Sequence, residues 1–210
     1  MTIITKIKQQ TVSSKEIQIS IYRAALNWHE WSDCFEHKGA LDELPVFSNP
    51  TRLKNFTHEY GLRWLGNESQ RAKFAADVLA NTNFIKAIQQ HNSSALDVVI
   101  EVVRDCVSNN RQQSAISKLA TFASPSYFIA YDKYSRQGLN LLLGRNKGFR
   151  GSYAQYRLDV DKILYEEMGL SILVEMKKHD CVYINSTATQ NAFQLRVLDN
   201  VLMHMGGRWS

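Results

Sequence analysis

The sequence predicts a compact, mainly α-helical fold, and three observations support this prediction. Apolar residues recur three and four positions apart in several stretches, which places them on one face of a helix. Capping residues and helix breakers stand at the ends of these stretches. The composition, 44% hydrophobic and 21% charged, is that of an ordinary globular protein. We therefore expect residues 1–210 to form a single helical domain, built either as one body or as two lobes around one cleft.

The first predicted helix covers residues 13–37. Ser13 and Glu16 have the spacing of a capping box, and an apolar stripe follows them. The stripe consists of Ile17, Ile21, Ala24, Trp28, Trp31 and Phe35. Residues 38–50 are rich in breakers and are predicted to be a surface connection. A helix is expected next from about Asn67 to Leu79, then a shorter one through Phe84 to Gln90.

The clearest helical pattern lies at residues 95–123 and predicts a tight helical hairpin. Two apolar faces with helical spacing form it: Leu96, Val99, Ile100, Val103 and Val107, then Ile116, Leu119, Ala120 and Ala123. Residues 109–111 separate the two helices, and Ser124-Pro125 ends the second. The apolar run 127–131 is too short for a helix and is predicted to be extended and buried, after which Asp132 opens another helix.

The C-terminal part begins with a basic, glycine-rich loop at residues 144–151, which carries Arg145, Lys147 and Arg150. A helix is expected from about Tyr153 to Met168. The last helix ends at Gly206-Gly207. One side of it is apolar and the other polar: Phe193, Val197, Leu198, Val201, Leu202 and Met205 against Arg196, Asp199 and Asn200.

Composition narrows the possible functions. No apolar run is long enough to cross a membrane, and the N-terminus lacks the pattern of a secretory signal, so we expect a cytoplasmic protein with no membrane partner. The cysteines Cys34, Cys106 and Cys181 are too far apart for a C-x-x-C motif and are interpreted as buried thiols. The six histidines show no ligand spacing, so neither a metal nor another cofactor is expected. A net charge of +5 and a pI near 9.1 favour a polyanionic partner.

Lys118 and Asp132 are the candidate catalytic residues, in the stretch formed by the hairpin's second helix and residues 125–139. They are fourteen residues apart, and a reversal at Ser124-Pro125 could direct both into one cleft. A carboxylate at a helix N-terminus stays ionised and can stabilise an oxocarbenium-like sugar. A lysine partly buried against Ile116 and Phe122 could have a lowered pKa and attack C1′ as a neutral amine.

The run Ser114-Ala-Ile-Ser-Lys118 follows a helical hairpin, and a proline, an apolar stretch, Asp132 and Arg136 come after it. This arrangement resembles the helix-hairpin-helix DNA glycosylase superfamily, in particular its 8-oxoguanine DNA glycosylase-like branch. The resemblance covers residues 95–139, with a weaker echo at Arg196-x-x-Asp199. Ser114 and Ile116 stand where members usually carry glycines in the hairpin turn.

The resemblance implies an enzyme that flips a modified base out of duplex DNA and excises it, and we expect a monomer. Which base is recognised, and whether the enzyme serves DNA repair or defence against phage, stay open from the sequence. It implies that Asp132 is essential for excision and that Lys118 is the nucleophile if the enzyme also has lyase activity. Contacts to the DNA backbone are predicted for the hairpin and for nearby basic residues: Ser114, Ser117, Arg136, Arg145, Lys147 and Arg150.

Three alternatives remain open from the sequence. Asp132 could serve only as a helix cap and Lys118 only as a solvated side chain. The chain could be a non-catalytic helical module that binds DNA or a protein partner. Arg23 and His29 have the arginine-to-histidine spacing of HEPN-type RNA nucleases, which gives a third and weaker interpretation.

Overall fold

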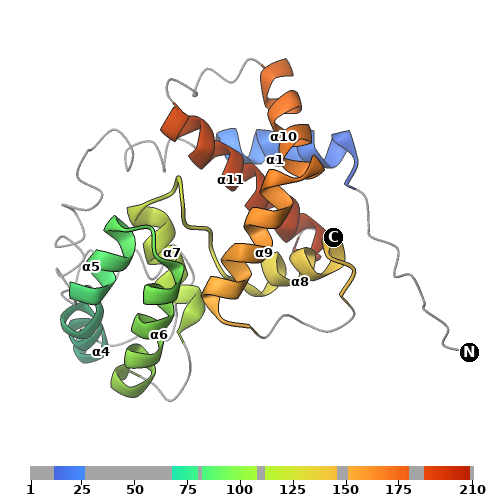
Figure 1. Cartoon of the computed structure of the whole chain (residues 1–210). Helices are drawn as coiled ribbons and strands as arrows, with labels where there is room; N and C mark the ends of the chain where they lie inside the picture. The colour runs from blue at the N-terminus through green and yellow to red at the C-terminus, as the bar shows by residue number, and fades with distance from the viewer. Residues whose placement is uncertain are drawn as a thin grey trace, which may run out of the picture. The chain divides into compact units, whose positions relative to one another are not determined.

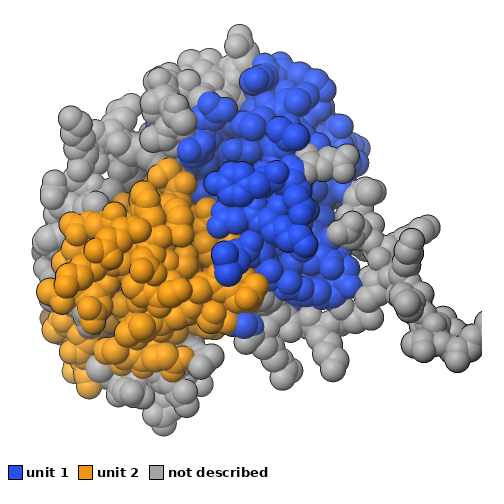
Figure 2. Space-filling model, viewed as in Figure 1, with its two compact units in different colours: residues 1–27, 132–151, 158–210 blue, residues 28–131, 152–157 orange. Residues whose placement is uncertain are grey.

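The structure is a computed structural model that describes residues 12–26, 68–79, 82–107, 112–145, 151–179 and 187–208. The described residues are mainly helical and contain no strand, which confirms the predicted fold class. None of the helices in these ranges is long and apolar enough to cross a membrane. The chain divides into two compact units, coloured separately in Figure 2: unit 1 comprises residues 1–27, 132–151 and 158–210, and unit 2 comprises residues 28–131 and 152–157.

Unit 2 contains the predicted hairpin. Its described elements are α4 (Glu68–Phe74), the π-helical turn η2 (Ala75–Leu79), α5 (Thr82–Gln89), α6 (Ser93–Val107) and α7 (Gln113–Ala123). α6 packs against both α5 and α7, and the apolar faces predicted for the hairpin are buried from Leu96 to Val103 and from Ile116 to Ala123; the side chain of Val107 lies outside the described residues. The helix expected from Asn67 to Leu79 is present as α4, but its last turn widens into η2. Helical periodicity does not distinguish these two forms over five residues.

The apolar run after the hairpin is buried and non-helical, as expected, and side chains satisfy its backbone. The Ser117 hydroxyl accepts a hydrogen bond from the Tyr131 N–H at 2.8 Å. The Tyr153 hydroxyl accepts from the Ile129 N–H at 3.2 Å and donates to the Ile129 carbonyl at 2.9 Å. Buried backbone groups outside a helix or sheet need such partners, so these hydroxyls hold the run in place.

Unit 1 is built around its last helix. Its elements are α1 (Ser14–Leu26), α8 (Lys133–Leu142), the part of α9 (Tyr153–Tyr165) from residue 158 onward, α10 (Glu167–Lys178) and α11 (Thr187–Met205). α11 packs against α1, α8 and α10 (Figure 1). The contact with α8 is so close that a Cβ built on Gly138 would lie 2.0 Å from the Leu202 carbonyl oxygen. Glycine at position 138 permits this packing.

The structure differs from the sequence-based prediction between residues 153 and 178. A single helix to about Met168 was expected, whereas α9 ends at Tyr165 and a separate, unpredicted helix, α10, begins at Glu167. Glu166 has an extended backbone (φ −91°, ψ −163°), which interrupts the helix. The turn is tight, since a Cβ on Gly169 would lie 1.5 Å from the Leu164 carbonyl oxygen. A glycine inside a helical pattern does not by itself predict a break, so Gly169 did not reveal this one in the sequence.

The polar side of the last helix is also buried. Asp199 and Asn200 are 3% and 1% exposed, because α11 is covered by three other helices. The Asn200 side-chain amide donates to the Ser20 carbonyl oxygen of α1 at 3.3 Å. The predicted continuation of the first helix beyond Leu26, the connection at 38–50, and the residues Cys34 and Cys181 lie outside the described residues, as does the side chain of Cys106.

Candidate functional site

Asp132 lies at the N-terminus of α8 and caps it. Its backbone is extended, and its Oδ1 accepts a hydrogen bond from the Ser135 N–H at 2.8 Å. The other carboxylate oxygen, Oδ2, lies 3.9 Å from the Arg208 guanidinium. The side chain keeps 15% of its surface exposed. Asp132 is therefore a helix cap, as the sequence predicted, but a cap that solvent still reaches.

A second carboxylate, Asp199 of α11, lies behind the first turn of α8. Its Oδ1 accepts a hydrogen bond from the Ser135 hydroxyl at 2.7 Å, and its Oδ2 accepts from the Arg196 guanidinium at 2.8 Å. Ser135 thus contacts both carboxylates, through its N–H for Asp132 and through its hydroxyl for Asp199. We call Asp132, Ser135, Arg196, Asp199 and Arg208 the carboxylate cluster.

The charge of Asp199 is costly in this position. Burial raises the pKa of its carboxyl from 3.8 to about 6; Arg196 lowers this pKa, Asp132 adds to the rise, and the Ser135 hydroxyl and Arg208 lower it. A buried carboxylate is destabilised by lost hydration unless hydrogen bonds and cations replace water. The two carboxylates are therefore linked electrostatically, since Asp132 raises the pKa of Asp199, and Asp132 is the more exposed of the two.

Two arginines lie near Asp132, one at its side chain and one at its backbone carbonyl. Lys133 is exposed beside it in the chain, and Arg208 is 48% exposed. The half-buried Arg136 donates from Nε to the Asp132 carbonyl oxygen at 3.1 Å, which fixes its guanidinium next to the start of α8. A carboxylate with arginines nearby suits a ligand that is itself polyanionic but develops positive charge at one atom.

The other predicted catalytic residue, Lys118, is half-buried on α7. It belongs to unit 2, whereas Asp132 belongs to unit 1. The two residues that were paired on sequence grounds are thus carried by different compact units.

The predicted DNA contacts have different surroundings. Ser117 is completely buried, and its hydroxyl donates to the Ser114 carbonyl at 3.1 Å while accepting from the Tyr131 N–H. Both hydrogen bonds of the Ser117 hydroxyl are therefore made within the protein. Ser114 is half-buried. The sequence does not show that the Ser117 hydroxyl makes these two hydrogen bonds, because the fold brings the Tyr131 N–H to it.

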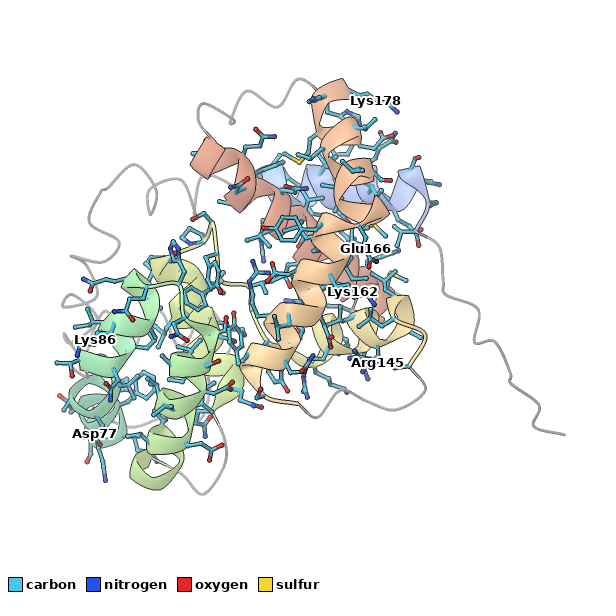
Figure 3. All side chains as sticks on the ribbon, in the orientation of Figure 1. Asp77, Lys86, Arg145, Lys162, Glu166 and Lys178 are labelled. Carbon is cyan, nitrogen blue, oxygen red and sulfur yellow. The ribbon has the colours of Figure 1, made fainter. Side chains whose placement is uncertain are left out.

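Arg145, labelled just after α8 in Figure 3, forms a two-pronged ion pair with Asp159 of α9. One of its hydrogen bonds, from Nη2 to Asp159 Oδ1, is 3.0 Å long. Hydrogen bonding to this carboxylate raises the pKa of the Arg145 guanidinium. The side chain is 39% exposed and so still presents charge at the surface. Lys147 and Arg150 lie outside the described residues.

Sequence reasoning did not name Asp199, Ser135 or Arg208 as site residues. It noted Arg196-x-x-Asp199 only as a weaker echo of the glycosylase resemblance, although the i,i+3 spacing is that of a paired contact on one helix. Arg208 had no such signal, because it follows the end of α11 and reaches Asp132 only through the fold.

The remaining predictions concern metals and the HEPN-type motif. Among the residues that the structure describes, no three His, Cys, Asp or Glu side chains are grouped so as to hold a metal ion. Arg23 lies half-buried on α1, and His29 is outside the described residues.

Neither protein-family models, nor curated proteins, nor solved structures include a match to this chain. Its function must therefore be inferred from its own residues, above all from those of the carboxylate cluster.

Proposed function

We propose that this chain is a DNA glycosylase that flips a modified base out of the duplex and cleaves its N-glycosidic bond, with Asp132 as the catalytic carboxylate. The supporting observation is a solvent-reachable carboxylate at a helix N-terminus, with Arg208 3.9 Å from one carboxylate oxygen and Arg136 hydrogen bonded to the backbone carbonyl of the same residue. The cations favour binding of a phosphate backbone. A carboxylate among them opposes that binding, and besides capping α8 we assign it a second purpose.

That purpose is provided by the reaction. When the bond between C1′ and the base nitrogen breaks, its electron pair leaves with the base and positive charge develops on the sugar. The Asp132 carboxylate stabilises this charge and accepts a proton from the water that attacks C1′. The proton taken by Asp132 passes through solvent to the departing base, so the products are a protonated base and a sugar that carries the hydroxyl from water.

Lys118 is proposed as the nucleophile of an accompanying lyase activity. Its neutral amine would attack C1′, and the base would leave with the electron pair of the broken bond and gain a proton that the amine loses. Opening of the C1′–O4′ bond would then give a Schiff base, from which loss of a C2′ proton would expel the 3′ phosphate.

The test is release of free base from duplexes that carry a panel of oxidised, alkylated or hypermodified bases. Asp132→Asn is expected to reduce release about 10²- to 10⁴-fold, the usual contribution of a proton-transfer group, with DNA affinity at least as high as that of the wild type. Asparagine still caps a helix, so the variant should fold. Asp161→Asn on α9 is the matched control and should retain full activity. Undiminished release by Asp132→Asn would show the proposal to be wrong.

The same duplexes test Lys118. Borohydride should trap a covalent adduct with the wild-type protein, and Lys118→Arg should abolish trapping while its positive charge preserves DNA binding. Base release without any trapped adduct would make the enzyme monofunctional and would remove Lys118 from the mechanism.

A further inference from the structure

We propose that the buried Asp199 is a positioning residue that sets the orientation and the electrostatic strength of Asp132. This inference deepens the proposed function and rests on it for the role of Asp132. The link between the two carboxylates is Ser135, which contacts both of them and belongs to the first turn of α8.

Orientation follows from the hydrogen bonds. Asp199 accepts from the Ser135 hydroxyl at 2.7 Å, and the N–H of the same serine holds Asp132 Oδ1 at 2.8 Å. Arg196 holds the other oxygen of Asp199 at 2.8 Å, which leaves this carboxylate little freedom to rotate. Asp199 is almost completely buried on α11, so the first turn of α8 is tied to a rigid helix. The hydrogen bond from the Ser135 N–H then holds the Asp132 side chain in a fixed orientation as well.

Electrostatic strength follows from the charge of Asp199. An ionised Asp199 adds a second negative charge behind Asp132, and its burial leaves little water to screen it. This increases the stabilisation of positive charge at a sugar bound next to Asp132. Asp199 itself is too buried to touch a substrate, since its side chain is only 4% exposed.

Asp199 changes charge within an ordinary pH range, because burial raises its pKa to about 6. The charged groups that interact with it are Asp132 of α8, Arg196 of α11 and Arg208 after α11. On the other helices packed against α11, Glu16 of α1 is hydrogen bonded to Ser13, and Glu175 of α10 to Lys178. We therefore expect Asp199 to control an acid limb of activity.

The first measurement needs no activity. The protein is labelled with ¹³C at aspartate carboxyl groups, and the Asp199 signal, identified by its loss in Asp199→Asn, is titrated by NMR. Its midpoint should lie near pH 6. Asp132→Asn should lower that midpoint, since a like charge is removed, and Ser135→Ala should raise it, since a stabilising hydrogen bond is lost. Asp161→Asn should leave it unchanged. A midpoint near 4, or one indifferent to both cluster variants, would refute the coupling.

The second measurement is the single-turnover rate of base excision at saturating protein. A group with a midpoint at pH 6 is about tenfold more ionised at pH 7 than at pH 5, so the wild-type rate should rise about tenfold over that range. Ser135→Ala should shift this limb to higher pH, and Asp199→Asn should abolish it without changing DNA affinity. An unchanged limb in both variants would refute the positioning role.

The two measurements separate this inference from the proposed function. Absence of excision by the wild-type protein, together with a coupled titration, would reject the glycosylase proposal while retaining the link between the carboxylates. Excision by the wild-type protein, with an unaltered pH profile in Asp199→Asn, would retain the glycosylase proposal and reject the positioning role of Asp199. Should Asp199→Asn fail to fold, the Ser135→Ala shift still decides, because that variant keeps the backbone N–H that caps Asp132.

Discussion

At the scale of single residues, unit 1 depends on a close approach that only glycine permits. Gly138 of α8 faces the backbone of α11, and a Cβ there would lie 2.0 Å from the Leu202 carbonyl oxygen and 2.7 Å from its carbon. These are backbone atoms, which move only if the whole helix shifts. The same contact brings Ser135, one turn earlier, within hydrogen-bond distance of Asp199.

Gly138→Ala is expected to lower the free energy of unfolding, because overpacking usually costs about 1–3 kcal/mol. Alanine favours helix over glycine by about 1 kcal/mol, which offsets part of that cost, and the measured change is the difference between the two. Urea denaturation followed by circular dichroism provides the measurement. Gln137→Ala, at the adjacent exposed position of α8, should change stability by less than about 0.5 kcal/mol. Equal stabilities of the two variants would mean that α8 and α11 are not so closely packed.

At the scale of elements, the buried run 128–131 shows how unit 2 holds a non-helical segment in its core. Tyr153 and Tyr156 lie in the first turn of α9 and bond the backbone of Ile129 and Ala130. Asp97 of α6 caps the same turn by accepting from the Tyr153 and Ala154 N–H groups at 2.7 and 2.9 Å. The start of α9 is thereby joined to both α6 and the run.

Tyr153→Phe should test this arrangement. Removing the hydroxyl leaves the buried N–H and carbonyl of Ile129 without their partner, which costs about 1–3 kcal/mol. Tyr165→Phe on the same helix is the matched control, because Tyr165 is 81% exposed and its hydroxyl can bond water in either state. Thermal unfolding should show a clear loss for the first variant and almost none for the second. Similar melting temperatures would mean that water replaces the Tyr153 hydroxyl.

At the scale of the whole molecule, the raised pKa of Asp199 makes stability depend on pH. The folded protein binds this proton more tightly than the unfolded chain does, since the pKa rises from 3.8 to about 6. The resulting stability is fully present below pH 3.8 and is lost as pH rises through 6. Glu16 and Glu175 act in the opposite direction, because their pKa values are lowered and their contribution is lost in acid.

Between about pH 4.5 and pH 7 the free energy of unfolding should therefore fall by about 2 kcal/mol through Asp199. Calorimetry or denaturant titration at closely spaced pH values measures the slope, and Asp199→Asn should remove it. The slope is the informative quantity, since the variant also alters the partner of Arg196 and can change the absolute stability. A wild-type slope that persists in the variant would assign the titration to another group.

Much of the fold was predictable from the sequence because helical periodicity is local. The stripe beginning at Ile17, the paired faces of α6 and α7, and the start of α8 at Asp132 all follow from residues within a few positions of one another. The break at Glu166 was not predictable in this way. It depends on an extended backbone at one residue and on the tight turn near Gly169, and neither changes the apolar spacing.

Asp132 illustrates the boundary between local and tertiary information. The sequence alone determined that it caps a helix, because an aspartate before a helical stretch satisfies the N–H groups of the first turn. Only the tertiary structure decided that a second, buried carboxylate stands behind it. The burial of Asp199 requires α1, α8 and α10 to enclose α11, and the approach of Arg208 requires the chain to return past α8. These contacts join residues that are far apart in the sequence. They depend on how the helices pack against one another, which the pattern of residues within one helix does not reveal.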